Sequence, residues 1–248
     1  MNIINAWFSA NLLSINLKKT NYILFGNKKM PDTCIKLNNE AISRVYQTKF
    51  LGVLIQANLK WNEHISSIAN KISKVVGIMN KIKHTLSTDH LKLLYQSLIQ
   101  PYLNYCCIVW ASPQKNTSLA TLYKLQKRSV RVILLRNYRD HSEPLFRELK
   151  LLSIYQLCLK QILIFVYKSL NSLLPHHCTN YFIETKHIHS HATRGHETNL
   201  YFAQARKVCR SNSIIIIGPK YWKLLPIINI YMPTNIITQF LLGLIIAL

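Results

Sequence analysis

The centre of the chain, from Trp61 to about Leu174, repeats apolar residues at helical spacing. In its first stretch the apolar positions are Ile65, Ile68, Ala69, Ile72, Val75, Val76, Met79 and Ile82. Steps of three and four residues place side chains on one face of an α-helix. Further helices are predicted from Thr88, from about Asn116 to Leu135, from Glu143 to Leu149 and from Ile154 to Leu173. Pro101 is expected to bend or interrupt the helix that starts at Thr88, and the whole segment predicts a helical bundle.

The first 58 residues have a different pattern. Asn2 to Leu13 predicts a short amphipathic helix, and three later segments are rich in strand formers. These segments are 20–25, 34–37 and 45–55, the last broken near Gly52. The pattern predicts a small antiparallel sheet beside one helix.

Beyond Pro175 the chain changes again. Residues 175–200 are rich in histidine and read as a loop, and S-I-I-I-I at 213–217 predicts a buried strand or a short apolar plug. The predicted fold class is therefore α+β. Its expected domains are 1–58 (sheet and helix), 59–174 (helical bundle) and 175–248 (irregular region).

The charge balance favours a polyanionic partner. The chain has 31 Lys and Arg against 9 Asp and Glu, a formal net charge of +22, while 49% hydrophobic residues suffice for a core. Nucleic acid is the first candidate because its phosphates release counterions when Lys and Arg approach. An anionic membrane surface is the second candidate. No membrane span is expected, since a span needs about 20 apolar residues and too few follow Pro233.

Cations recur on the predicted helices at positions away from the apolar faces. On the first helix these are Lys71, Lys74, Lys81 and Lys83. On the third they are Lys124, Lys127, Arg128 and Arg131, spaced as i, i+3, i+4 and i+7. Such faces suit phosphate binding, and nearby aromatic side chains can stack on bases.

The carboxylates do not predict a complete catalytic site. The aspartates are Asp32, Asp89 and Asp140, and no two are close in sequence. Two-metal phosphoryl chemistry needs carboxylates converging on ions about 4 Å apart. Asp89 and Glu63 instead fall in predicted first turns of helices, where an acid favours the helix dipole.

The cysteines and histidines leave one alternative open. The six cysteines form no C-x-x-C pair, and with no signal peptide visible over residues 1–8 they indicate reduced, mostly buried thiols of an intracellular protein, nuclear or cytoplasmic. His176, His177, Cys178, His187, His189, His191, His196 and Cys209 are the candidates for a zinc-dependent module. Their spacing matches no zinc template, so a loop of exposed histidines and no metal site is favoured.

Seven motifs, in order, resemble the reverse transcriptases of non-LTR retrotransposons, especially the jockey-like group. N-L-L-S-I-N-L-K-K-T-N-Y-I-L-F at 11–25 is similar to their motif D, F-L-G-V at 50–53 to motif E, and W-N-E-H-I at 61–65 to the start of their thumb helix. The downstream matches are L-Y-Q-S-L-I-Q-P-Y-L-N-Y (94–105), L-Q-K-R-S-V-R (125–131), P-L-F-R-E-L (144–149) and G-P-K-Y-W-K-L-L-P (218–226).

This resemblance implies a fragment covering the late palm, the thumb and the carboxy-terminal extension of an RNA-directed DNA polymerase. In such enzymes the metal-binding aspartates lie upstream, in the fingers and earlier palm. The parent class would use Mg²⁺, whereas this fragment would hold no cofactor and would be inactive alone. The implied partners are RNA or an RNA–DNA duplex and the missing fingers and palm.

The resemblance also assigns residues. Lys19 matches the motif D lysine, which helps to protonate the leaving pyrophosphate. Phe50, Leu51 and Gly52 match the hairpin that grips the primer end, and the lysines from Lys71 to Lys83 would face the duplex backbone. The rival interpretation is a helical protein-interaction or structural module without nucleic-acid function.

Overall fold

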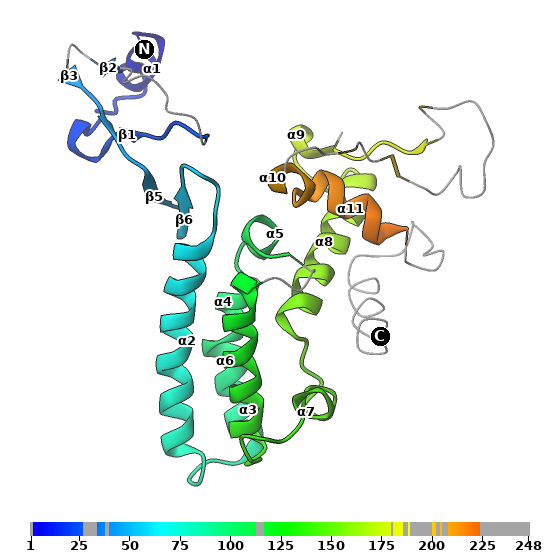
Figure 1. Ribbon diagram of the computed structural model, residues 1–248. Helices are drawn as coiled ribbons and strands as arrows, with labels where there is room; N and C mark the ends of the chain where they lie inside the picture. The colour runs from blue at the N-terminus through cyan, green and yellow to red at the C-terminus, as the bar shows by residue number, and fades with distance from the viewer. Residues whose placement is uncertain are drawn as a thin grey trace. The chain divides into compact units, whose positions relative to one another are not determined.

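The computed structural model describes residues 2–26, 34–37, 40–112, 117–179, 181–185, 188, 200–201, 204 and 208–223. Over these residues the fold is α+β, with long helices and a few short strands, as the sequence predicted. The chain divides into two compact units, Met1–Ser66 and Ser67–Leu248, whose elements are labelled in Figure 1.

The first unit holds one helix and short strands. Its elements are α1 (Asn2–Ala10), the 3₁₀ helix η1 (Leu17–Lys19), β1 (Asn21–Tyr22), β2 (Lys36–Leu37), β3 (Glu40–Ala41), β4 (Ser43–Arg44), β5 (Gln47–Phe50) and β6 (Val53–Gln56). Strands β2 and β3 pair antiparallel, as do β5 and β6. Strand β1, however, pairs with β4 in parallel, which corrects the all-antiparallel prediction. A parallel pair needs a crossover of about a dozen residues or more, and the segment that contains β2 and β3 provides it.

The β5–β6 hairpin turns at two residues. Phe50 pairs with Val53, and both intervening residues have positive φ, 45° at Leu51 and 85° at Gly52. Positive φ at both central residues is typical of the type I′ turn, whose twist matches that of the strands. The predicted break near Gly52 is confirmed, and it lies at the tip of this hairpin.

Helix α2 (Asn62–Ile82) follows the hairpin. The backbone N–H of Leu54 on β6 donates to Nδ1 of buried His64 at 3.3 Å, which ties the hairpin to the start of the helix. Glu63 lies in its first turn, as predicted.

The second unit contains the rest of α2 and the other helices. These are α3 (Thr88–Leu98), α4 (Gln100–Asn104), α5 (Cys107–Trp110), α6 (Thr117–Ile133), α7 (Ser142–Glu148), α8 (Ile154–Leu170), α9 (His176–Thr179), α10 (Val208–Ser211) and α11 (Ile214–Trp222). The start predicted at Thr88 is confirmed, with the Ser87 side chain accepting from the His90 N–H. Pro101 lies in the first turn of α4, so it separates two helices as expected.

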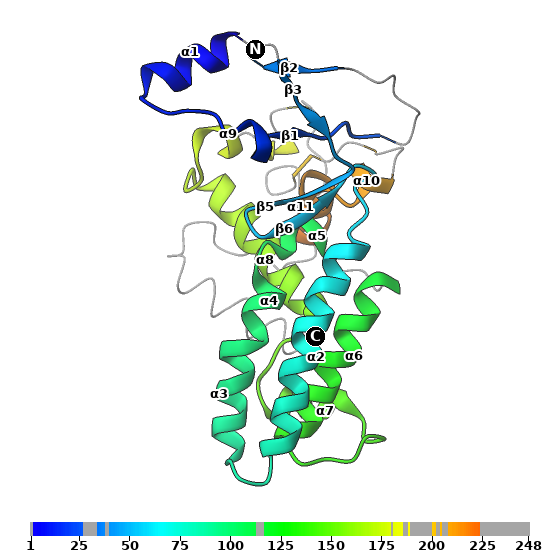
Figure 2. The ribbon, with the colours of Figure 1, turned by 90° about the vertical axis from the view of Figure 1, so that its left-hand side faces the viewer.

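The core of this unit comes from facing helical stripes. Ile72, Val76 and Met79 of α2 are buried, as are Leu91 of α3 and Leu122 of α6. Helices α2, α3 and α6 run alongside one another in Figures 1 and 2, and Figure 2 shows α3 and α6 on either side of α2. The lysines of α2 and the lysines and arginines of α6 thus lie on the sides of these helices that face away from the buried stripes.

Residues 214–222 form helix α11, so the strand predicted at 213–217 is wrong. The N–H groups of Ile216 and Ile217 donate to the Ser213 carbonyl, both at 3.0 Å. The helix packs on α8, and a Cβ at Gly218 would lie 2.8 Å from the Phe182 ring and 2.9 Å from Val166. Isoleucine favours strands only weakly, and close packing against a neighbouring helix overrides that preference.

The cysteines are not all buried. Cys107 of α5 and Cys158 of α8 are buried, while Cys34 and Cys106 are exposed, which corrects the expectation for those two. None of the described helices combines the length and the apolar character needed to cross a membrane.

Candidate nucleic-acid interface

One basic face lies on α2. Lys71, Lys74 and Lys81 are all exposed and recur at steps of three and seven residues, so they lie on one side of the helix. Ile72, Val76 and Met79 are buried on the opposite side. Apolar packing of α2 therefore directs its lysines to solvent.

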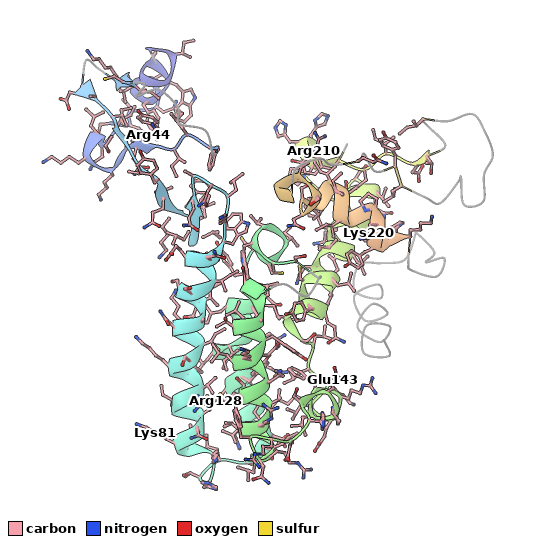
Figure 3. All side chains as sticks on the ribbon, viewed as in Figure 1. Arg44, Lys81, Arg128, Glu143, Arg210 and Lys220 are labelled. Atoms are coloured by element: carbon pink, nitrogen blue, oxygen red, sulfur yellow. The ribbon has the colours of Figure 1, made fainter. Side chains whose placement is uncertain are left out.

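A second basic face lies on α6. Lys124 and Arg128 are exposed, and Lys127 and Arg131 are half-buried. The opposite side of the helix buries Leu119, Leu122, Gln126, Ser129, Val130 and Ile133. The predicted stripe therefore forms one face, and Figure 3 labels Arg128 on α6 and Lys81 at the end of α2.

Few acids oppose these cations along the chain. Between Glu63 and Asp140 the sequence contains a single acidic residue, Asp89. That carboxylate lies in the first turn of α3, where it favours the helix dipole. The bundle that carries both faces is thus strongly electropositive, which attracts polyanions over distances of about 10 Å at ordinary salt.

Buried Gln126 fixes the orientation of α6. Its Nε2 donates to Tyr95 Oη at 2.7 Å and to the Leu152 carbonyl at 2.8 Å, and its Oε1 accepts from the Ile154 N–H at 2.9 Å. The amide therefore joins α6 to α3 and to the start of α8. Burial raises the pKa of Tyr95 to about 12, an effect that the hydrogen bond from Gln126 partly offsets.

Two of the α6 cations have partners in the fold. Lys127 Nζ lies 4.8 Å from the centre of the Tyr123 ring. Arg131 donates to the Asp140 carbonyl through Nε at 2.9 Å and Nη2 at 2.8 Å. On α2, Lys71 Nζ lies 5.2 Å from the centre of the Tyr102 ring. These three cations are therefore held more firmly than a charge pattern alone indicates.

The other predicted nucleic-acid residues belong to the first unit. Phe50 is 60% exposed and Leu51 74% exposed, and Gly52 completes the hairpin tip. Lys19 is exposed at the end of η1, where its backbone N–H donates to Asn16 Oδ1 at 3.2 Å. The structure thus presents all four residues to solvent.

Within the described residues no three His, Cys, Asp or Glu side chains group so that they could hold a metal ion. His176 and His177 are exposed on α9. His187, His189, His191 and His196, which the zinc alternative invokes, lie outside the described residues, as does Asp32.

The sequence prediction missed three residues just after α6. Arg136, Tyr138 and Arg139 are exposed, and Tyr138 is 82% exposed. They follow the last residue of the predicted stripe and precede Asp140, so the long run without acids was the sequence signal that could have added them to the candidate residues.

Two polymerases of mobile elements are similar to the chain. A probable RNA-directed DNA polymerase from the transposon X-element of Drosophila melanogaster is 21% identical over 147 residues, 58% of this chain and 16% of that protein. The RNA-directed DNA polymerase from the mobile element jockey of Drosophila funebris is 26% identical over 124 residues, 49% of this chain and 13% of that protein. The chain therefore matches less than a fifth of either relative's length. No family model matches it, and no solved structure does.

Proposed function

We propose that this chain, which is related to the RNA-directed DNA polymerases of jockey-like non-LTR retrotransposons, grips the template–primer duplex and does not perform the chemistry by itself. It corresponds in this proposal to the late palm, the thumb and the extension of such a polymerase. The ligand is an RNA–DNA duplex bound through its phosphates, with little dependence on base sequence.

The observation that carries the proposal is the pair of basic faces on α2 and α6. Lys71, Lys74 and Lys81 on one helix and Lys124, Lys127 and Arg128 on the other are directed outward by buried faces. Cations on rigid helices suit a duplex backbone, whose phosphates repeat regularly and carry no sequence information.

Hairpin and motif residues take secondary roles in the proposal. Phe50, Leu51 and Gly52 contact the primer end, since an exposed leucine with positive φ is a costly surface feature that suits a contact site. Lys19 acts only where the rest of a polymerase supplies the Mg²⁺ site. Asp89 is not assigned to that Mg²⁺ site, because its place in the first turn of α3 already accounts for the carboxylate through the helix dipole.

The test is the affinity of the purified chain for a labelled RNA–DNA duplex over a salt series. Replacing Lys124, Lys127 and Arg128 by Ala removes three phosphate contacts. We expect the slope of log affinity against log salt to shrink by about 2 to 3, since each contact contributes about 0.9. Arg131 is left in place because it holds the loop at Asp140.

The matched control replaces three exposed cations, Arg210 of α10, Lys220 of α11 and Lys223 at the end of α11, and removes the same charge. Its slope should stay close to that of the unchanged protein. Equal losses in both variants would mean that net charge alone attracts the duplex, and binding that does not weaken with salt would contradict the proposal.

A second candidate rests on exposed apolar side chains of the first unit. Ile3, Trp7, Leu12 and Leu13 are all more than half exposed, and such surface marks contact sites. The candidate is a docking module for another protein segment, with the fingers and early palm of a related polymerase as the first choice. Replacing Trp7 and Leu12 by Ser should raise solubility and leave duplex affinity unchanged if this surface serves only docking.

A further inference from the structure

A loop held by its own hydrogen bonds follows the second basic face, which lies on α6. Residues 134–141 join α6 to α7, and their backbone is fixed by hydrogen bonds. The Arg136 N–H donates to the Arg131 carbonyl at 2.9 Å, the Asp140 N–H donates to the Asn137 carbonyl at 3.2 Å, and Asp140 Oδ2 accepts from the Asn137 N–H at 3.0 Å. The loop therefore presents its side chains in a set arrangement.

Tyr138 is the most exposed large apolar side chain of this loop. It is 82% exposed, which leaves a large apolar ring in water. One side of the ring faces the Arg131 guanidinium, whose central carbon lies 5.8 Å from the ring centre. That guanidinium is itself held by two hydrogen bonds to the Asp140 carbonyl, so the ring has a cationic partner on one side and solvent over most of its remaining surface.

The neighbours of Tyr138 are cationic as well. Arg136 and Arg139 are both exposed. An aromatic face flanked by cations suits nucleic acid that offers both a base and a phosphate. In a duplex the base faces are stacked on one another and closed to a side chain, whereas an unpaired base offers its face.

We propose that Tyr138 is a stacking site for one unpaired base of a single-stranded nucleic acid, with Arg136 and Arg139 on the flanking phosphates. This site rests on the proposed function and adds a second ligand to it. The single strand would be the unpaired template or the displaced strand next to the gripped duplex. The carboxylates of an acidic peptide would bind the arginines but would not stack on the ring. A nucleic acid binds both kinds of side chain, the arginines through its phosphates and the ring through a base.

The experiment compares a labelled blunt RNA–DNA duplex with the same duplex carrying an unpaired overhang, each bound to the full chain. Tyr138→Ala should lower affinity for the overhang substrate by about 5- to 100-fold, the usual effect of removing one stacked base. It should leave affinity for the blunt duplex unchanged, and Tyr138→Phe should restore the overhang affinity because the ring alone stacks.

The matched control is Tyr46→Ala. Tyr46 is also exposed and has an arginine, Arg44, 5.2 Å from its ring centre, but it lies outside the loop, so no selective loss is expected. As a second readout, 2-aminopurine in the overhang should change fluorescence on binding to the unchanged protein and to Tyr138→Phe, and not to Tyr138→Ala.

The outcomes separate the two proposals. Equal loss of affinity on both substrates, or no loss on either, would overturn the stacking site and would leave the proposed duplex grip standing. Overhang binding that depends on Tyr138 without any blunt-duplex binding would support the stacking site and overturn the duplex grip.

Discussion

Helices α2 and α6 both direct cations to solvent, but their buried sides differ. The inner side of α2 over residues 67–82 is apolar, with Ile68, Ile72, Val76 and Met79 buried. The inner side of α6 includes Gln126, whose amide makes three hydrogen bonds to other segments. Apolar packing is roughly indifferent to small rotations of a helix, whereas hydrogen bonds require one orientation.

The cations follow the same division. Each helix places one lysine over a tyrosine ring, Lys71 over Tyr102 on α2 and Lys127 over Tyr123 on α6. Arg131 of α6 is in addition fixed to the Asp140 carbonyl by two hydrogen bonds. We therefore infer that α2 contributes general electrostatic attraction and that α6 sets the position of the ligand. Substitutions at the buried sides and at the cations of the two helices test this difference.

Gln126→Leu should cause the largest loss of stability. The change leaves the Tyr95 hydroxyl, the Leu152 carbonyl and the Ile154 N–H buried without the amide, and each such group costs about 1–3 kcal/mol. We expect the free energy of unfolding, measured with urea, to fall by about 3 kcal/mol or more. Gln96→Ala, at an exposed position of α3, should change it by less than about 0.5 kcal/mol.

Alkaline pH should weaken the contact between Tyr95 and Gln126. The pKa of Tyr95 is raised from 10.0 to about 12, so the fold favours the neutral phenol. This contribution is complete below pH 10 and is lost as the pH rises through 12. Urea unfolding at pH 9 and pH 11 should show a smaller decline in Tyr95→Phe than in the unchanged protein. Identical declines would show that folding does not raise the pKa of Tyr95.

Helix periodicity predicted both basic faces because a repeat of 3.6 residues separates the two sides of any amphipathic helix. It did not predict Gln126, which lies beside the cations Lys127 and Arg128 in the sequence. The hydrogen-bond partners of its amide are 26 to 31 residues away. A local pattern carries no information about partners at that distance.

The error at α11 has the same origin. A run of isoleucines is typical of strands, but the close approach of Gly218 to Phe182 and Val166 is a tertiary contact. The hairpin at Leu51 and Gly52 was predictable, since its turn depends on residues adjacent in sequence. Local rules thus predicted the elements and their outer faces, and long-range contacts determined what fixes them.

Arg131→Lys should have an intermediate effect. A lysine cannot reproduce the paired donation to the Asp140 carbonyl, so we expect the free energy of unfolding to fall by about 1–2 kcal/mol. Lys71→Arg on α2 is the matched change in the other direction and should be neutral, because Lys71 contacts only a ring face in the described contacts. Similar losses in both variants, measured by urea unfolding, would remove the distinction between the two helices.

Ile78→Lys should have the smallest effect on stability and still alter binding. Ile78 is 59% exposed and lies seven residues after Lys71 and three before Lys81, on the basic face of α2. Its replacement should change the free energy of unfolding by less than about 0.5 kcal/mol. If α2 faces the phosphate backbone, the added cation should steepen the salt slope for duplex binding by about 0.9.

Leu93→Lys, an equally exposed change on α3, adds the same charge away from both faces and should leave the slope unchanged. A slope that is unaltered by Ile78→Lys would mean that α2 does not face the duplex, and the attraction would then belong to α6 alone.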